Sequence, residues 1–223
     1  MSPTIWHDLL TATGETLYMV IVSTALSALA GLPLGVVLFS SARLKPNRIL
    51  NRLLSSIINI SRSVPFIILL VAIIPFTRWL VGTSIGLHAA MVPLTLGAIP
   101  FFARLVDNAC QGLSQGLIEA GLSMGASTSQ IIRRIILPET LPSLIQALTV
   151  TAITLVNYSA MAGTVGGGGL GDLAIRYGYQ RFNPFVMLIT VLVLVVIVQL
   201  IQTGGDWATG RILRRRALRK AAY

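Results

Sequence analysis

The sequence predicts an all-α integral membrane protein, because its composition and the placement of its charges do not suit a water-soluble globule. Of the 223 residues, 54% are hydrophobic and only 11% are charged, whereas about a quarter of the residues of a soluble domain are charged. Long intervals without charge alternate with short basic segments. Because roughly 20 helical residues cross a hydrocarbon core of about 30 Å, these intervals are candidate membrane spans within a single domain, residues 1–223.

Four charge-free intervals are long enough to cross a bilayer, and a fifth contains one arginine. We expect five transmembrane helices, at about 16–41, 54–77, 82–106, 143–166 and 184–206. Arg62 lies within the second of them, and the uncharged piece that follows it is too short to cross alone. We interpret Arg62 as an anchor whose long side chain extends to an interface. A role for Arg62 in a transport pathway or at a partner surface is the alternative.

The basic residues predict the orientation of the chain. All but three of its 17 lysines and arginines lie on one side of the membrane in this arrangement, the exceptions being Arg78, Arg176 and Arg181. Since lysine and arginine concentrate in cytoplasmic segments, the amino terminus is expected outside and the carboxyl terminus in the cytoplasm. The terminal segment RILRRRALRK is interpreted as an anchor for membrane lipid headgroups. The net charge of +10 therefore does not predict a nucleic-acid partner.

A polar segment at about 108–141 separates the third and fourth spans and is expected in the cytoplasm. Apolar residues recur along its first part at the spacing of one helical stripe: Leu113, Leu117, Ala120 and Met124. Gly125 then occupies a position typical of a left-handed helix end. Ser127 and Gln130 have the spacing of a capping box, which begins a second helix.

The second helix of the polar segment is expected to be amphipathic and short. Isoleucines form one face and two arginines lie on another: Ile131, Ile132, Ile135 and Ile136, with Arg133 and Arg134. Pro138 is expected to end this helix, because the residue before a proline avoids the helical conformation. Pro142 then suits the first turn of the fourth span. These residues alone leave two roles equally open, an interfacial helix pair resting on lipid and an element that fills a cleft on a cytoplasmic partner.

The spacing of seven residues in this segment resembles the coupling segment of the permease subunits of ABC importers. That pattern is Glu-Ala-Ala, three residues, Gly, nine residues, Ile, one residue, Leu-Pro, and the matching positions are Glu119, Ala120, Gly121, Gly125, Ile135, Leu137 and Pro138. Gly121 departs from it, since the pattern has alanine there. The stretches RSVPFIILL, IPFTR, VGTSIGL, YSAM and GGGGLG are similar to the permeases of bacterial methionine importers over residues 15–207.

The resemblance implies a type I ABC importer permease fold and a set of partners. The chain would pair with a second copy of itself in the bacterial inner membrane and contact two ATPase subunits through the seven matching residues. An extracytoplasmic methionine-binding protein would deliver the solute, and ATP and Mg would bind to the ATPase subunits. We expect no catalytic residue, cofactor or metal in the permease itself. A P-loop needs Lys followed by Ser or Thr, whereas Lys45 precedes Pro46 and Lys220 precedes Ala221.

Two further groups of residues are candidates for the transport path. In the fourth span, polar and thioether side chains could line it, although helix packing would use the same residues: Asn157, Tyr158, Ser159 and Met161. The GGGGLG segment, Gly166–Gly171, follows a membrane span rather than a strand, so we interpret it as flexible backbone at the outer mouth and not as a dinucleotide site. It is either a plain loop or a lip that contacts the binding protein.

Three other functions compete with methionine import. The chain could carry another small amino acid or solute within the same kind of importer. It could also be a secondary transporter or channel that works alone, although the four uncharged spans offer no acid for proton coupling. A membrane scaffold is the third alternative.

Overall fold

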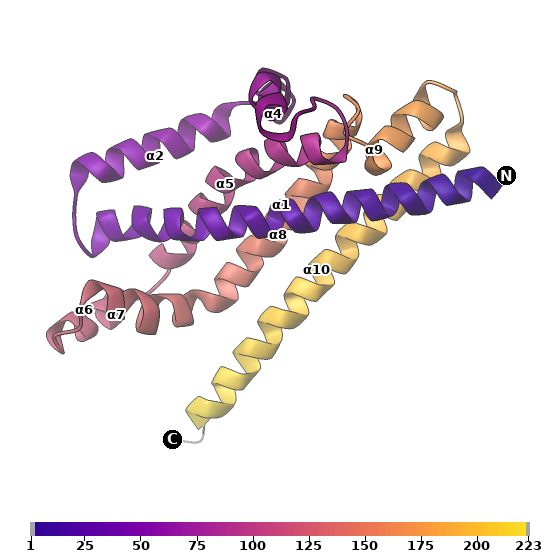
Figure 1. The fold of residues 1–223 in the computed structure, drawn as a ribbon. Coiled ribbons are helices and arrows are strands. Elements are labelled where there is room, and N and C mark those ends of the chain that lie inside the picture. Colours follow the sequence, from indigo (N-terminus) through magenta and orange to yellow (C-terminus); the bar gives the residue numbers. More distant parts are fainter. Residues whose placement is uncertain (1–2, 222–223) are drawn as a thin grey trace.

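The computed structural model describes residues 3–221, and helices joined by turns make up this whole range (Figure 1). The elements are α1 (Pro3–Arg43), α2 (Arg48–Ser63), α3 (Phe66–Ala72), α4 (Ile74–Val81), α5 (Leu87–Gln111), α6 (Gln115–Ser123), α7 (Thr128–Ile131), the π-helical turn η1 (Ile132–Ile136), α8 (Leu137–Gly163), α9 (Gly169–Leu173), the π-helical turn η2 (Ala174–Tyr179) and α10 (Pro184–Ala221). No strand occurs among the described residues, so the all-helical prediction is confirmed for them.

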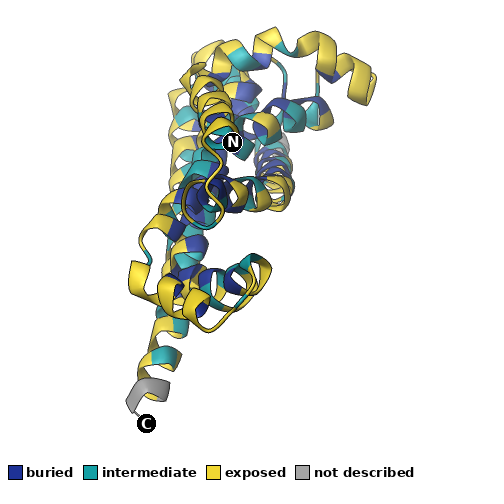
Figure 2. Cartoon of the chain, turned by 90° about the vertical axis from the view of Figure 1, so that its left-hand side faces the viewer, coloured by how far each residue is buried: buried dark blue, intermediate teal, exposed yellow. Residues whose placement is uncertain are grey.

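Four helical stretches are long and apolar enough to cross a membrane. They are Ile5–Arg43, Leu87–Gln111, Thr128–Gly163 and Pro184–Leu218. Exposed residues cover much of the outer surface (Figure 2), and on α10 they include an aliphatic stripe with one-turn spacing: Leu188, Leu192, Val196 and Leu200. Such a stripe suits contact with hydrocarbon chains.

The two ends of the molecule differ in charge and in the elements that they carry. α6 and α7 lie at the same end as the turn between α1 and α2, whereas α4, α9 and the amino terminus lie toward the other (Figure 1). The first of these ends carries several exposed arginines: Arg43, Arg48, Arg133, Arg134 and Arg214. We call it the basic end.

The packing of α1 along α5 organises the interior. Gly31 and Gly35, four residues apart on α1, face α5 so closely that a Cβ atom on Gly35 would lie 2.5 Å from the carbonyl oxygen of Ala103. Small residues with this spacing let two helix backbones approach each other. Gly31 and Gly35 therefore form a packing motif between α1 and α5.

The expected second span is not one continuous helix. α2 and α3 meet at 98°, because Pro65 has no backbone N–H to donate and Val64 before it takes extended dihedral angles of φ −80° and ψ 123°. A further break at Ile73 separates α3 from α4. The described chain thus has four helices able to span a membrane, or five spans if α2 and α3 together form one broken span.

The break also changes the interpretation of Arg62 as an interface anchor. The Arg62 guanidinium carbon lies 5.9 Å from the ring centroid of Phe101, and Phe101 belongs to the middle of α5 rather than to either end. Arg62 is therefore placed near half the depth of the bundle.

Pro138 does not end the helix of the polar segment, contrary to expectation. The chain continues from α7 through η1 into α8, and the Leu137 N–H donates to the Ile132 carbonyl oxygen in the wider π-helical pattern. Pro138 occupies the first turn of α8, where a missing N–H costs little. Pro142, expected in the first turn of a new helix, instead lies inside α8. The polar segment is therefore joined to the fourth span without a break.

The α1–α5 contact predicts a large difference between two glycine substitutions on one helix. Gly35→Ala should destabilise the protein by about 1–3 kcal/mol, because a methyl group there overlaps the α5 backbone. Gly14→Ala is the matched control, since no atom lies within 4 Å of the added Cβ. Thermal unfolding in detergent should show a lower midpoint for Gly35→Ala alone, and equal midpoints for the two variants would contradict this packing.

Candidate functional site

The polar segment folds into a compact helical hairpin made of α6, α7 and η1. α6 ends in a left-handed turn at Gly125, whose φ is +78°. The Gly125 N–H donates to the Leu122 carbonyl at 2.9 Å, and the Ala126 N–H donates to the Gly121 carbonyl at 3.1 Å. These bonds satisfy carbonyl groups that the helix end leaves free. The prediction of a glycine-centred end is confirmed, and we name the unit Gln115–Ile136 the hairpin.

The second half of the hairpin begins with the predicted capping box. The Ser127 N–H donates to the Gln130 side-chain oxygen at 2.8 Å, and the Gln130 N–H donates to the Ser127 hydroxyl at 3.3 Å. Both bonds engage N–H groups for which the first helical turn has no internal partner. The turn between the two halves is therefore fixed from both sides.

Close packing joins the two halves of the hairpin. Gly121 is buried, and a Cβ atom there would lie 2.7 Å from Cδ1 of Ile135. An alanine, as in the importer pattern, would force the Ile135 side chain to shift. The departure at Gly121 is thus matched by close contact between α6 and η1.

An apolar cluster joins the hairpin to the spans. Ile131 and Ile136 are 0% exposed. They belong to one cluster with Ile118 of α6 and with residues of α1, α5 and α8: Val36, Phe39, Phe102, Val106, Cys110, Leu144 and Ala147. We call this the basic-end cluster. Since it includes side chains from three spans and from both halves of the hairpin, a force on the hairpin acts on those spans directly.

Three of the four residues of the predicted apolar stripe point away from the protein, whereas Leu113 lies before α6 and packs against the basic-end cluster. Ile118 and Gly121 face inward, whereas Leu117, Ala120 and Met124 are exposed, Met124 by 86%. The helical spacing was correct, but tertiary packing buries the neighbouring face, which the small Gly121 opens to η1. The outward face is left apolar, with the exposed carboxylate of Glu119 beside it.

The seven residues of the importer pattern divide into two groups. Glu119, Ala120, Gly125 and Pro138 are exposed, while Gly121 is buried and Ile135 and Leu137 are partly buried. Glu119 is oriented by Gln115, whose side-chain amide donates to it at 2.8 Å. The first group is available to a partner, and the second holds the hairpin together.

The contact between α10 and the start of α8 was not predicted. Arg216 donates to the carbonyl oxygens of Pro138 and Glu139, and it forms an ion pair with the Glu139 carboxylate at 3.2 Å. The partners are far apart in sequence and share no motif. This contact connects the last helix to the segment that leaves the hairpin.

A second polar network lies between α2 and α5, and only its local ion pair could be predicted from the sequence. Arg104 pairs with the buried Asp107 at 3.0 Å, as their spacing of three predicts. The same guanidinium also donates to the Asn59 side-chain oxygen at 2.7 Å and to the Ser55 hydroxyl at 3.1 Å. Arg104 therefore holds α2 against α5, a role that local spacing could not indicate.

The polar residues expected along a path in the fourth span face in different directions. Asn157 and Met161 are exposed on α8, and the Tyr158 ring stacks on Phe66 with centroids 4.2 Å apart. Ser159 is buried, and its hydroxyl donates to the Val156 carbonyl of its own helix at 2.8 Å. Ser159 thus does not share the surface that Asn157 and Met161 form.

The glycine-rich segment is held by hydrogen bonds to α1 and to the residue before α5, whereas flexible backbone was expected. The Glu15 carboxylate of α1 accepts from the Gly169 N–H at 2.7 Å, and the Thr16 hydroxyl accepts from the Leu170 N–H at 2.9 Å. The Gly166 carbonyl accepts from the Gly86 N–H at 2.9 Å. The segment joins α1 and α5 at the end opposite the basic end. Among the described residues, no three His, Cys, Asp or Glu side chains are grouped to hold a metal ion.

Comparisons with known proteins agree with this geometry. Residues 16–217 match the profile of the family described as "Binding-protein-dependent transport system inner membrane component". A Vibrio cholerae protein named "Probable D-methionine transport system permease protein MetI" is 54% identical over 209 residues, 93% of each chain. The "Methionine import system permease protein MetP" of Bacillus subtilis is 43% identical over 210 residues, 93% of this chain and 95% of the relative.

A solved structure has the same fold. A chain in the structure described as "Inward facing conformations of the MetNI methionine ABC transporter" superposes with a TM-score of 0.93 at 50% identity. The superposition covers 95% of this chain and 99% of that one. The likeness therefore extends over the spans and the hairpin together.

The capping box predicts that one hydroxyl stabilises the turn of the hairpin. Ser127→Ala should cost about 1 kcal/mol of local stability, which corresponds to roughly fivefold faster hydrogen exchange of the α7 amides. Ser129→Ala, an exposed position in the same turn, is the control and should leave exchange unchanged. Equal exchange in both variants would show that the cap contributes nothing.

Proposed function

Because this chain belongs to the family of binding-protein-dependent transport system inner membrane components, we propose that it is the membrane-spanning permease subunit of an ATP-driven importer of methionine. The named relatives are methionine permeases, and the superposed chain comes from a methionine ABC transporter. The permease binds and moves the solute, while a separate ATPase subunit hydrolyses ATP.

One observation carries this proposal: the hairpin has an exposed face that can dock on a partner, and its buried side chains belong to the basic-end cluster. The outward face of α6 offers apolar side chains for affinity and the Glu119 carboxylate for orientation: Leu117, Ala120 and Met124 beside Glu119. An amphipathic helix of this kind fits a groove on a protein partner. The basic-end cluster then transmits the motion of that partner to the spans.

The same assignment places the chain in the bacterial inner membrane with the basic end in the cytoplasm. The hairpin and the arginine-rich segments lie at this one end, as positive-inside bias requires. The amino terminus is then outside, and α2 with α3 counts as the fifth, broken span. An ATPase in the cytoplasm reaches the hairpin from this side.

The working unit is an assembly of several subunits around a two-fold axis. Two copies of the permease pair with each other, which is the commonest symmetry of soluble oligomers and suits a path between identical halves. Each copy docks one ATPase subunit that holds ATP and Mg, and an extracytoplasmic methionine-binding protein delivers the solute to the opposite end. ATP binding draws the two hairpins together, and the spans rock between outward-open and inward-open arrangements.

Reconstitution distinguishes this mechanism from a transporter that works alone. Liposomes that contain the permease, the ATPase and the binding protein should accumulate radiolabelled methionine only when ATP is present. Accumulation of methionine by the permease without the ATPase would support a secondary transporter or channel. Competition by other amino acids in the complete system tests which solute is transported. If another amino acid is preferred, methionine is the wrong solute, but the chain is still the permease of an ATP-driven importer.

Reversal of the Glu119 charge predicts loss of coupling without loss of folding. Glu119→Lys should lower ATP-dependent methionine uptake by about tenfold or more, since a charge at the wrong sign in an interface costs several kcal/mol. Asp206→Lys is the matched control, because Asp206 is also exposed and accepts from a glutamine amide one turn earlier, at 3.0 Å. Uptake by Asp206→Lys should stay at the wild-type level.

A backbone variant tests the same coupling independently of charge. Gly125→Val should also uncouple or release the ATPase, because a β-branched residue is strained at a φ of +78°. Membrane insertion of both variants should be normal by extraction and protease protection. Wild-type uptake and transport-linked ATP hydrolysis in both Glu119→Lys and Gly125→Val would refute the coupling role of the hairpin.

A further inference from the structure

The broken second span leaves a cationic side chain at a depth where membrane proteins rarely place one. Arg62 is one residue before the end of α2, about 21 Å along that helix from Arg48 at 1.5 Å per residue. Its guanidinium lies beside the middle of α5, 5.9 Å from the Phe101 centroid. Ionisable residues within spans are costly and mark solute pathways or partner contacts.

Arg62 belongs to a polar face that runs the length of α2. The residues recur at helical spacing: Arg48, Arg52, Ser55, Asn59 and Arg62. Aliphatic residues, including Ile49, Leu53 and Ile60, occupy another side of the helix, and both sides are exposed. A span with one polar face needs water or a polar partner along that face. Arg104 satisfies Ser55 and Asn59, which leaves Arg62 to a different partner.

The charges around the two deep arginines differ. Arg104 has the Asp107 carboxylate at 3.0 Å. Among the side chains that the structure describes, ion pairs join Arg104, Arg176 and Arg216 to carboxylates, and none of them includes Arg62. The Arg62 guanidinium can therefore form an ion pair with a carboxylate from outside the chain.

A cavity of about 200 Å³ opens at this guanidinium. Its walls come from the α2–α3 bend, α5 and α8: Ser61, Arg62, Val64, Phe66, Leu69, Gly97, Phe101 and Tyr158. The Phe66 and Tyr158 rings stack face to face, within 3° of parallel and with centroids 4.2 Å apart, and both border the cavity. Gly97 keeps the cavity open, since a Cβ there would already lie 3.3 Å from Leu69 and 3.6 Å from Phe66.

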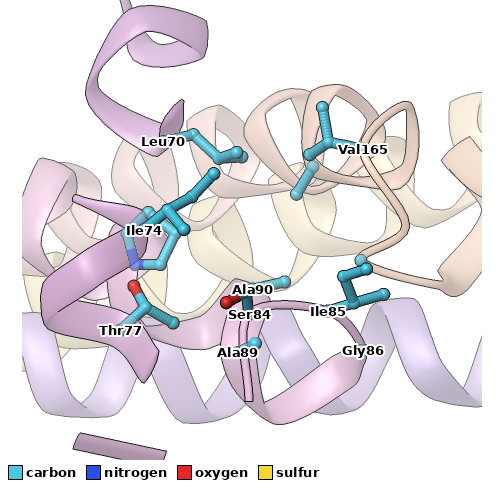
Figure 3. Close-up of a pocket in the computed structure, with 12 residues that line it drawn as sticks. Leu70, Ile74, Thr77, Ser84, Ile85, Gly86, Ala89, Ala90 and Val165 are labelled. Carbon is cyan, nitrogen blue, oxygen red and sulfur yellow. The ribbon is translucent and has the colours of Figure 1, made fainter. Parts of the chain in front are cut away.

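A second cavity lies beyond this site, toward the end opposite the basic end. It has a volume of about 250 Å³, and side chains of α3, α4 and α5 surround it together with Val165, which follows α8 (Figure 3). The two cavities are lined by residues one turn apart on the same three helices. The pairs are Phe66 and Leu70 on α3, Gly97 and Pro93 on α5, and Tyr158 and Ala162 on α8. The outer cavity is thus placed to lead to Arg62.

We propose that the cavity at Arg62 is a solute-binding site within the permease, which holds the carboxylate of a free α-amino acid with an unbranched apolar side chain. The Arg62 guanidinium binds the carboxylate, and the hydroxyls of Ser61 and Tyr158 are available to accept from the ammonium group. The side chain lies against Phe66, Phe101 and Leu69, where a thioether gains contact with aromatic rings. This inference rests on the proposed function and gives it a place of binding within the span.

A labelling experiment measures binding at this cavity directly. The complex of permease and ATPase is reconstituted without binding protein, with Cys110→Ala to remove the one cysteine and Ser61→Cys as a reporter. A water-soluble methanethiosulfonate should react with Ser61→Cys. Methionine at ten times its dissociation constant should slow that reaction about tenfold, and methioninol, which lacks the carboxylate, should not slow it.

Substitution of Arg62 tests the charge. Added to the reporter chain, Arg62→Gln should weaken protection by methionine about tenfold or more, as loss of a charge-assisted hydrogen bond requires, and Arg62→Lys should restore most of it. In the complete importer, Arg62→Gln should lower methionine uptake by a similar factor while the subunits still co-elute. Arg52→Gln is the control, an exposed arginine on the same face of α2, and should behave as wild type.

The outcomes separate this inference from the proposed function. If the wild-type importer takes up methionine but methionine does not slow labelling, or Arg62→Gln keeps full protection, the binding site is refuted and the proposed function stands. Equal loss in Arg62→Gln and Arg62→Lys, with the subunits dissociated, would assign Arg62 a purely structural role. If the wild-type importer takes up no methionine, the proposed function fails and this inference with it.

Discussion

The basic-end cluster is the contact on which the rest of the structure depends. Ile131 and Ile136 of the hairpin have no exposed surface, and they pack with Phe39 of α1 and with Phe102 and Val106 of α5. Protein interiors are close-packed and transmit displacement instead of absorbing it. A hairpin that rested on lipid would need no such base, whereas a hairpin that moves the spans requires one. The continuous backbone from α7 through η1 into α8 adds a second rigid connection.

Local features of the hairpin could be predicted because neighbouring residues determine them. The helix end at Gly125 and the capping box of Ser127 and Gln130 involve contacts within five residues, so their spacing carries the information. The outward direction of Leu117 and Met124 was missed, because the choice between two faces of α6 depends on where η1 packs. The passage of the helix through Pro138 was missed for a similar reason. A π-helical turn changes the hydrogen-bond pattern without a sequence signature of its own.

Longer-range features show the same division. Charge-free intervals predicted four of the spans, since the bilayer imposes their length. Pro65 alone accounts for the break between α2 and α3. The angle of 98° between these helices and the resulting depth of Arg62 depend on packing against α5, which the sequence does not reveal. The partners of Arg104 on α2 are distant in sequence and could not be found from spacing. Two arginines that look alike in the sequence therefore differ in the structure, one held by Asp107 and the other facing a cavity.

The central claim is that the hairpin and the spans move as one body. Hydrogen exchange of the backbone amides of residues 131–136, measured on the reconstituted importer with and without bound ATP, tests it most directly. The account predicts slow exchange of these amides in both states, because the basic-end cluster stays packed while the two copies move. Exchange that becomes fast in either state, to the rate of the exposed turn around Gly125, would show that the hairpin separates from the spans and would contradict the account.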